Sequence, residues 1–185
     1  MSKYQESFET KGQFFLLRNA EENDAQKMFE FMRHVDGETT FLAREPGEFE
    51  ASFSLESEAA LLKSWSAGED KLFLVAETKS GEIAATCGCT RNIGRRRTRH
   101  LAEIAVSVRQ DFWRMGLGRR LFQIQFDWCR QKEIEKLCLT VDTENLRALG
   151  LYLSLGFVVE GTLKQQAKMP DGSYRDLYTM GKFFR

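Results

Sequence analysis

The stretch of sequence that decides the fold runs Val106-Ser107-Val108-Arg109-Gln110-Asp111-Phe112-Trp113-Arg114-Met115-Gly116-Leu117-Gly118-Arg119-Arg120. Its first residues have the pattern of a strand, and its two glycines open a helix. The first N–H groups of a helix have no partner within the helix, and together with the helix dipole they attract anions. Glycine lets the backbone approach phosphate oxygens closely, and the arginines add charge that favours phosphate. The stretch therefore predicts a phosphate site, although a glycine pair can also serve only to shape a turn or a helix end.

Two known phosphate-binding patterns can be tested against these letters. The dinucleotide fingerprint G-x-G-x-x-G requires a third glycine, and Leu121 stands in that place. The nucleoside-triphosphate loop G-x-x-x-x-G-K-[ST] is absent from the chain. Both of these nucleotide sites are excluded.

The pattern of apolar residues predicts the elements around the glycine stretch. Leu117, Leu121, Ile124 and Trp128 form one apolar stripe along a helix. The predicted strands cover 14–18, 72–77, 82–91, 98–108, 137–141, 157–168 and 174–184, and the other helices cover 19–35, 55–67 and 145–155. A loop is predicted over 36–53, with a short helix within it as the alternative. This order predicts an α/β layer built on one sheet, without the regular strand–helix alternation of a doubly wound fold.

Length and composition limit the class of protein. The 185 residues fit one domain, and the 42% hydrophobic and 29% charged fractions exclude a wholly disordered chain. No apolar run approaches the roughly 20 residues of a membrane span, and residues 1–10 lack a signal-peptide core. We therefore expect a cytoplasmic protein that does not bind membranes. The formal net charge of +0 argues against a general nucleic-acid binder if the charges are evenly mixed.

The cysteines and histidines do not indicate a metal site. The spacing Cys87-x-Cys89 is not that of a zinc ribbon, and Cys129 and Cys138 stand apart from it. His34 and His100 are far apart and have no companions at ligand spacing. We expect buried, reduced cysteines and no metal.

Two motifs give the chain a family resemblance. The glycine stretch after Glu103 to Val108 resembles the Q/R-x-x-G-x-G/A motif of the GNAT family of N-acetyltransferases, which use acetyl-coenzyme A. The second family motif is a strand that ends in an Asn, followed by a short helix with a Tyr and then by L-G-F. Here the strand and Asn are Leu139 to Asn145, the Tyr is Tyr152, and L-G-F is Leu155-Gly156-Phe157. A final E-G…D-G-x-Y-x-D…M pattern is also similar, and the resemblance covers about 101–184. Trp113 departs from the usual Gln or Arg, which puts a side-chain contact to the cofactor from that position in doubt.

The resemblance implies a fold and a division of labour along the chain. The fold would be a single mixed, mostly antiparallel sheet flanked by helices. Acceptor-side helices would occupy 19–67, the acetyl-CoA-binding core 98–157, and a C-terminal hairpin 157–184. The family position of Asn145 contacts cofactor or substrate. The cofactor-binding residues would be Val106, Ser107, Val108, Arg114, Met115, Gly116, Leu117, Gly118, Arg119 and Asn145.

The resemblance also implies the chemistry, which is acyl transfer from a thioester to an amine. Tyr152 resembles the tyrosine that protonates the departing thiolate, and the competing interpretation is a core aromatic. Glu103 matches a glutamate that often acts as base through water, and the competing interpretation is an exposed strand residue. The main-chain N–H near Val106 would polarise the thioester carbonyl.

The charges are not evenly mixed along the chain. Residues 21–58 carry 11 acidic and three basic side chains, so the rest has a net charge of +8. We hypothesise that the acidic segment favours a cationic amine acceptor. A basic run, Arg91 with Arg95, Arg96, Arg97 and Arg99, allows a phosphate or nucleic-acid patch, but a solvated turn is favoured because no aromatic residue lies within it.

The prediction is thus an acetyl-CoA-dependent N-acetyltransferase acting on a small cationic amine or on a protein N-terminus or lysine. The alternative is a catalytically idle module that binds acyl-CoA. A homodimer is compatible with either, and nucleic acid is not the expected partner.

Overall fold

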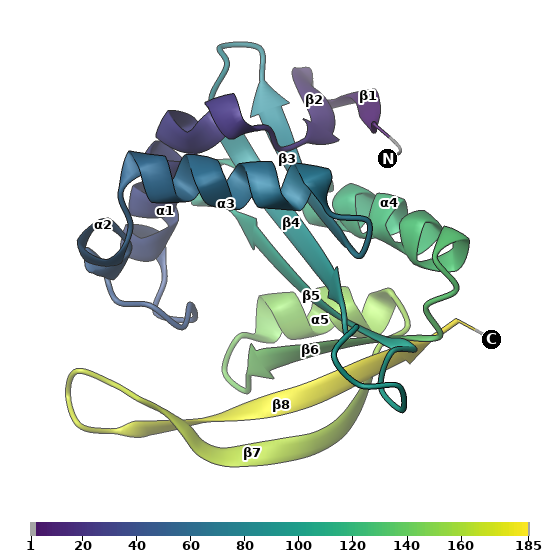
Figure 1. Cartoon of the computed structure of the whole chain (residues 1–185). Helices are drawn as coiled ribbons and strands as arrows, with labels where there is room; N and C mark the ends of the chain where they lie inside the picture. The colour runs from purple at the N-terminus through teal and green to yellow at the C-terminus, as the bar shows by residue number, and fades with distance from the viewer. Residues whose placement is uncertain (1–2, 185) are drawn as a thin grey trace. The chain divides into compact units, whose positions relative to one another are not determined.

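The computed structural model describes residues 3–184, in which eight strands form one sheet in the order β1-β2-β3-β4-β5-β6-β8-β7 (Figure 1). β5 pairs with β6 in parallel, and every other pairing whose register is defined is antiparallel. The prediction of a single mixed, mostly antiparallel sheet flanked by helices is therefore confirmed.

The elements follow one another in the predicted order, with one additional strand. The strands are β1 (Gln5–Thr10), β2 (Gln13–Asn19), β3 (Lys71–Thr78), β4 (Ile83–Arg91), β5 (Leu101–Val108), β6 (Lys136–Asp142), β7 (Val158–Lys168) and β8 (Tyr174–Phe183). The helices are η1 (Glu22–Asp24), α1 (Ala25–Glu38), α2 (Glu48–Ser52), α3 (Leu55–Ala67), η2 (Gln110–Phe112), α4 (Leu117–Gln131) and α5 (Leu146–Ser154).

α2 lies within the predicted loop 36–53, and the short helices η1 and η2 were not predicted as separate elements. Two larger elements, β1 and α1, also differ from the sequence prediction. β1 was not predicted, because its sequence is polar apart from Phe8, and it forms by pairing with β2 along its whole length. α1 continues through Gly37 to Glu38, whereas the predicted helix ended at Val35. Glycine only weakens a helix, so it did not end α1 here.

The chain divides into two compact units, which we describe separately. Unit 1 contains Met1–Thr90 and Ala105–Trp128, and unit 2 contains Arg91–Ile104 and Cys129–Arg185. The assignment of all residues to a single domain remains a prediction.

The core of unit 1 lies where α1 and α3 cover the sheet. Figure 1 shows these two helices side by side over β3, and Met28, Phe31, Leu62 and Val75 pack together there. The apolar stripe of α4 is also buried as predicted, with Leu117, Leu121, Ile124 and Trp128 at most 5% exposed. α4 is thus held in unit 1 by its buried apolar face.

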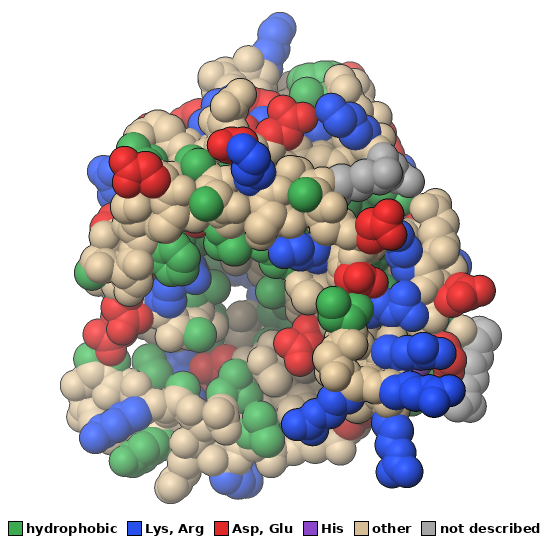
Figure 2. All heavy atoms as spheres, viewed as in Figure 1, with side chains coloured by type: hydrophobic (Ala, Val, Ile, Leu, Met, Phe, Trp, Pro, Cys, Tyr) green, Lys and Arg blue, Asp and Glu red, His purple; other side chains and the backbone are tan. Residues whose placement is uncertain are grey.

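Unit 2 is built on β6, β8 and β7, with α5 following β6. The β7–β8 hairpin turns at Gly172, which has φ +85° and donates its N–H to Met169 O at 2.9 Å. Figure 2 shows hydrophobic side chains on the surface of this hairpin, and Val158, Val159 and Tyr174 are exposed there.

The cysteines are free thiols, as expected. Cys87, Cys89 and Cys129 are buried, and Cys138 is partly buried. Burial raises the pKa of the Cys138 thiol, with Lys136 opposing this effect. None of the helices in residues 3–184 is long and apolar enough to cross a membrane.

Candidate active site

The glycine stretch forms a backbone cradle at the start of α4, in unit 1. Arg114 and Gly116 both have left-handed backbones, with φ +62° and φ +81°. The first helical hydrogen bond runs from Arg120 N to Gly116 O at 2.9 Å. The N–H groups of Leu117, Gly118 and Arg119 precede that bond, so the helix itself offers them no acceptor. Left-handed residues beside a helix N-terminus make a concave anion-binding backbone.

Gly116 is required by its backbone rather than by lack of space. A Cβ built on Gly116 would lie 3.7 Å from Cζ of Phe8, an ordinary contact. The left-handed conformation instead costs about 1–2 kcal/mol for a residue with a Cβ. Arg114, two residues earlier, bears such a cost, and strained residues of this kind cluster at functional sites.

Trp113 braces the strand that leads into the cradle. Its indole Nε1–H donates to Val108 O at 2.8 Å. On the other side of the same strand end, Arg109 N donates to Ala84 O of β4 at 3.0 Å. The residue that departs from the family motif thus holds the main chain of the cradle.

The arginines of the stretch have different roles. Arg114 and Arg119 are exposed, whereas Arg120 forms two hydrogen bonds with Glu6 of β1, Nε to Oε1 at 2.8 Å and Nη2 to Oε2 at 2.5 Å. The Glu6 carboxylate raises the pKa of Arg120. β1 therefore attaches to the first turn of α4, an arrangement that the sequence prediction lacked because it had no β1.

Glu38 connects the acidic N-terminal segment to the glycine stretch. Its Oε2 accepts a hydrogen bond from Gln110 N at 2.7 Å, across 72 positions of sequence. Glu38 is the last residue of α1 and Gln110 the first of η2. Sequence reasoning missed this contact because no local pattern relates the two residues.

Glu103 lies on the accessible face of β5, in the part of the strand that belongs to unit 2. It is exposed, while its neighbours Ala102 and Ile104 are buried on the opposite face. Its register partner in β6 is Cys138. Val106, Ser107 and Val108 continue the same strand in unit 1 and are partly buried.

Asn145 is the N-cap of α5. Its Oδ1 accepts from Ala148 N at 3.1 Å, and its own N–H donates to Asp142 O at 3.0 Å. The turn before it is fixed by the buried Asp142, whose Oδ1 accepts from Glu144 N and whose Oδ2 accepts from Arg175 Nη1 at 3.2 Å. Asp142 and Arg175 were not among the predicted site residues.

Tyr152 lies in the last turn of α5 and is 7% exposed. Its ring centroid is 6.0 Å from that of Phe157. The helix ends as predicted at Gly156, which has φ +86° and donates to Leu153 O, while Phe157 N donates to Tyr152 O at 3.0 Å. These two bonds form a Schellman cap, which fixes the backbone of Tyr152.

The candidate residues therefore fall into two groups. The cradle and Val106–Val108 belong to unit 1, and Glu103, Asn145 and Tyr152 belong to unit 2. Among residues 3–184 there is no cluster of three His, Cys, Asp or Glu side chains that could hold a metal ion.

Comparison with protein families and known structures gives a consistent result. Residues 29–157 match the model of the acetyltransferase (GNAT) family. A GNAT-family acetyltransferase structure from Streptococcus pneumoniae is 30% identical, with a TM-score of 0.84, covering 92% of this chain and 99% of that one. The structure of yncA, a putative acetyltransferase from Salmonella typhimurium with its cofactor acetyl-CoA, is similar in fold at 20% identity, with a TM-score of 0.77, covering 92% of this chain and 94% of that one.

A curated relative resembles part of the chain. The L-amino acid N-acetyltransferase AaaT of Escherichia coli is 29% identical over 89 residues, which are 48% of this chain and 54% of that protein. The match thus spans about half the length of the relative.

Proposed function

Because this chain belongs to the GNAT family of acetyltransferases, we propose that it transfers an acetyl group from acetyl-CoA to a primary amine. One observation carries the proposal: the left-handed backbones of Arg114 and Gly116 at the start of α4. Together with the N–H groups of the first helical turn, they suit a pyrophosphate. That fit supports acetyl-CoA as the cosubstrate.

The residues that would hold acetyl-CoA lie in unit 1. The backbone from Met115 to Arg119 would bind the pyrophosphate, with the exposed Arg114 and Arg119 side chains adding charge. The backbone of Val106, Ser107 and Val108 would pair with the pantetheine arm. Within unit 2, the Asn145 oxygen already caps α5, so the amide nitrogen is the atom that this residue would offer to cofactor or substrate.

Acetyl-CoA supplies an acetyl group activated as a thioester. Glu103 would accept, through water, a proton from the ammonium group of the acceptor, which leaves a neutral amine whose lone pair forms the bond to the thioester carbonyl carbon. The N–H near Val106 would donate to the carbonyl oxygen as negative charge develops on it. Tyr152 would donate its phenolic proton to the sulfur as the carbon–sulfur bond breaks, and the second proton lost by the nitrogen on forming the amide would pass through water to the phenolate. The products are the amide and the free thiol.

The pKa of the acceptor amine decides how much free energy its deprotonation by the base requires. A lysine side chain has a pKa of about 10.4 and an α-amine about 7.7–8.0, so less free energy is required to deprotonate an α-amine. The relative named as an L-amino acid N-acetyltransferase supports an α-amine acceptor. We therefore propose that small molecules with an α-amine, or protein N-termini, are better acceptors than lysine side chains.

The acidic segment supports a cationic acceptor less strongly than its sequence suggests. Five of its 11 acidic side chains lie within 4.0 Å of a basic partner, namely Glu21, Glu22, Asp24, Asp36 and Glu50. The preference we propose thus depends on the remaining carboxylates. Of these, Glu38 contacts the residue that begins η2, just before the glycine stretch.

Calorimetric titration with acetyl-CoA tests the proposed cofactor site. We expect saturable binding by the natural chain and its loss in Gly116→Glu, which places an anion in the cradle. Equal binding by the variant would contradict the assignment of the cradle to pyrophosphate.

A panel of acceptors tests the proposed acceptor class. The rates of thiol release with an amino acid, a diamine, a peptide N-terminus, a lysine side chain and a neutral amine are compared at two salt concentrations. We expect the α-amines and the cations to be preferred, with a preference that weakens as salt rises. Equal rates on neutral and cationic amines at both concentrations would remove the role of the acidic segment.

The alternative of an idle acyl-CoA-binding module has its own signature. It requires tight acetyl-CoA binding without amine-dependent thiol release. The presence of Glu103 and Tyr152 at the positions where the family carries a base and an acid favours the enzyme.

A further inference from the structure

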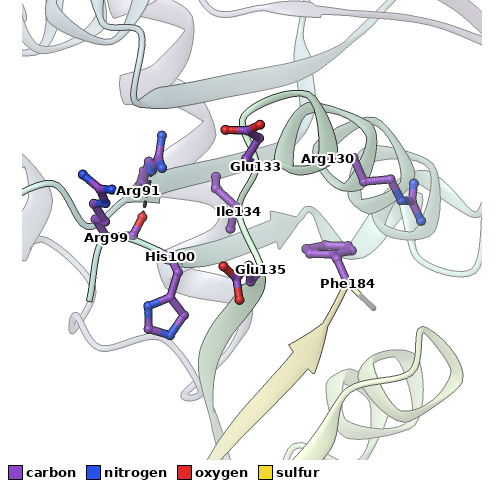
Figure 3. A pocket seen from close by; sticks show the side chains of 8 residues that line it. All are labelled: Arg91, Arg99, His100, Arg130, Glu133, Ile134, Glu135 and Phe184. Carbon is purple, nitrogen blue, oxygen red and sulfur yellow. Dashed lines mark hydrogen bonds between the residues drawn. The ribbon is translucent and has the colours of Figure 1, made fainter. Parts of the chain in front are cut away.

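An open hollow of about 510 Å³ lies in unit 2, outside the residues assigned to acetyl transfer. Three segments far apart in sequence line it: the β4–β5 loop, the end of α4 with the turn that follows, and Phe184. Figure 3 shows Arg91 and Arg99 on one side of the hollow, Arg130 with Phe184 on the other, and Glu133, Ile134 and Glu135 between them.

Backbone hydrogen bonds hold these segments in place. Glu135 N and Lys136 N both donate to His100 O, and Phe184 N donates to Glu135 O at 2.9 Å. The β4–β5 loop has internal order of its own. Arg91 Nε donates to Arg99 O at 2.8 Å, and Thr98 N donates to Arg95 O at 3.1 Å. The loop that carries the arginines is therefore held in a defined conformation by its own hydrogen bonds.

Three arginines line this hollow, and four further basic residues lie close to them in the sequence. We define the basic surface as Arg91, Arg95, Arg96, Arg97, Arg99, Arg130 and Lys132, which with Glu133 and Glu135 have a net charge of +5. Arg95, Arg96 and Arg97 are exposed, and none of them forms an ion pair with a described residue. Their charges are thus available to an external partner.

We propose that the basic surface binds the phosphodiester backbone of nucleic acid, without reading its sequence. Guanidinium groups match phosphate geometry with two parallel hydrogen bonds, and six of the seven basic residues are arginines. No Phe, Tyr or Trp lies within the 91–100 loop to stack on bases, and the ring of Phe184 already packs against the Arg130 guanidinium, 5.5 Å from the ring centroid. We therefore assign the contact to phosphates rather than to bases.

The carboxylates in the hollow distinguish a polymer from a single phosphate. Glu133 and Glu135 lie between the two basic sides, so a small anion at the centre would be repelled. A chain of phosphates that runs along the basic surface can contact the arginines and avoid the two carboxylates. A membrane is disfavoured because Ile93, 66% exposed, is the only large apolar side chain of the loop, and surface adsorption requires an apolar face.

The test is fluorescence anisotropy of labelled single-stranded RNA, and of DNA of equal length, titrated with the full chain from 50 to about 300 mM salt. Each phosphate contact contributes about 0.7 to the slope of log K against log salt for a single strand. Arg95→Gln/Arg96→Gln/Arg97→Gln should lower that slope by about 2 and weaken binding at least about tenfold at the lowest salt. The single substitutions should each lower it by about 0.7, which gives a second measurement should the triple variant fold poorly.

The matched control is Lys11→Gln/Lys79→Gln/Lys168→Gln, which removes the same charge from exposed positions outside the basic surface. We expect the control to bind like the natural chain. Undetectable binding at 50 mM salt, equal losses in both triple variants, or tighter binding to anionic phosphatidylserine vesicles than to RNA would each overturn the proposal. Because no residue of the basic surface has a role in acetyl transfer, none of these results depends on the proposed function.

Discussion

At the scale of single residues, the account depends most on Tyr152, whose phenol is the proposed proton donor. In Tyr152→Phe the ring still fills the same buried place beside Phe157, so packing is kept. Loss of a general acid lowers turnover by about 10²-fold or more. We expect that loss in kcat, with an unchanged calorimetric Kd for acetyl-CoA. Turnover equal to that of the natural chain would remove the assigned role.

A second residue-scale prediction concerns Glu58 of α3, which is 2% exposed. Its Oε2, Oδ2 of Asp36 and Nε of Arg44 are buried without a protein partner. Burial raises the pKa of Glu58, and the charge of Arg44 opposes this. The folded chain therefore keeps this proton at pH values where the unfolded chain has lost it. Stability from this group is complete below the unfolded pKa of about 4.3 and is lost as the pH rises through the folded value.

Glu58→Gln removes the charge and keeps the shape, so the variant should be more stable than the natural chain at pH 7.5. We expect a rise in Tm of a few degrees, as about 1 kcal/mol produces in a chain of this length. The difference should vanish near pH 4, where the natural residue is also neutral. A variant that is less stable at pH 7.5 would show that the Arg44 charge outweighs burial.

The local sequence predicts the structural roles of some residues and gives no indication of the roles of others. Gly116 and Gly156 follow from the need for left-handed backbones next to helix ends, which is a local requirement. Glu38 and Glu6 contact residues 72 and 114 positions away, and only the folded chain brings these partners together. From the sequence, Trp113 put a side-chain contact to the cofactor in doubt. In the structure its indole N–H donates to Val108 O.

At the scale of elements, the first turn of α4 should tolerate no side chain at Gly116. Gly116→Ala adds only a methyl group at ordinary distance from Phe8, so its effect reports the left-handed backbone. A cost of about 1–2 kcal/mol predicts acetyl-CoA binding weakened about five- to thirtyfold, measured by calorimetry. Gly150→Ala is the matched control, since this glycine of α5 has no atom within 4 Å of the added methyl group and no positive φ. It should leave binding unchanged, and a similar loss in both variants would contradict the assignment.

The attachment of β1 to α4 gives a further prediction. Glu6→Gln breaks the charged pair with Arg120, whose side chains are 38% and 35% exposed, so we expect a loss of at most about 1 kcal/mol. Glu9→Gln removes a carboxylate from the same strand and serves as the control, because Glu9 forms no ion pair with any residue of 3–184. Thermal unfolding should show a lower Tm for Glu6→Gln alone. Identical Tm values would mean that the pair contributes nothing to the docking of β1.

Most elements could be predicted because their apolar residues repeat at helix or strand spacing. α3 was predicted with its exact bounds, Leu55–Ala67, and the stripe of α4 was predicted residue by residue. β1 carries only Phe8 as a large apolar residue, so its apolar pattern does not predict a strand. Pairing with β2 decides its conformation instead.

At the scale of the whole molecule, the charge total of +0 conceals an uneven distribution. The acidic segment 21–58 is partly neutralised by ion pairs, among them Lys3–Glu21 and Lys63–Glu22, whose basic residues lie outside it. The basic 91–99 run has no such compensation at Arg95, Arg96 and Arg97. The sequence favours a role for the acidic segment and only a solvated turn for the basic run, whereas in the folded chain the basic run is the less neutralised of the two.

The most direct test of the central claim is amine-dependent thiol release from acetyl-CoA. The purified chain is mixed with acetyl-CoA, with and without an α-amino acid, and free thiol is measured over time. The account predicts release that requires the amine, with an N-acetylated product in equal amount and a rate reduced about 10²-fold in Tyr152→Phe. Tight acetyl-CoA binding without amine-dependent release, on every amine of the panel, would contradict it.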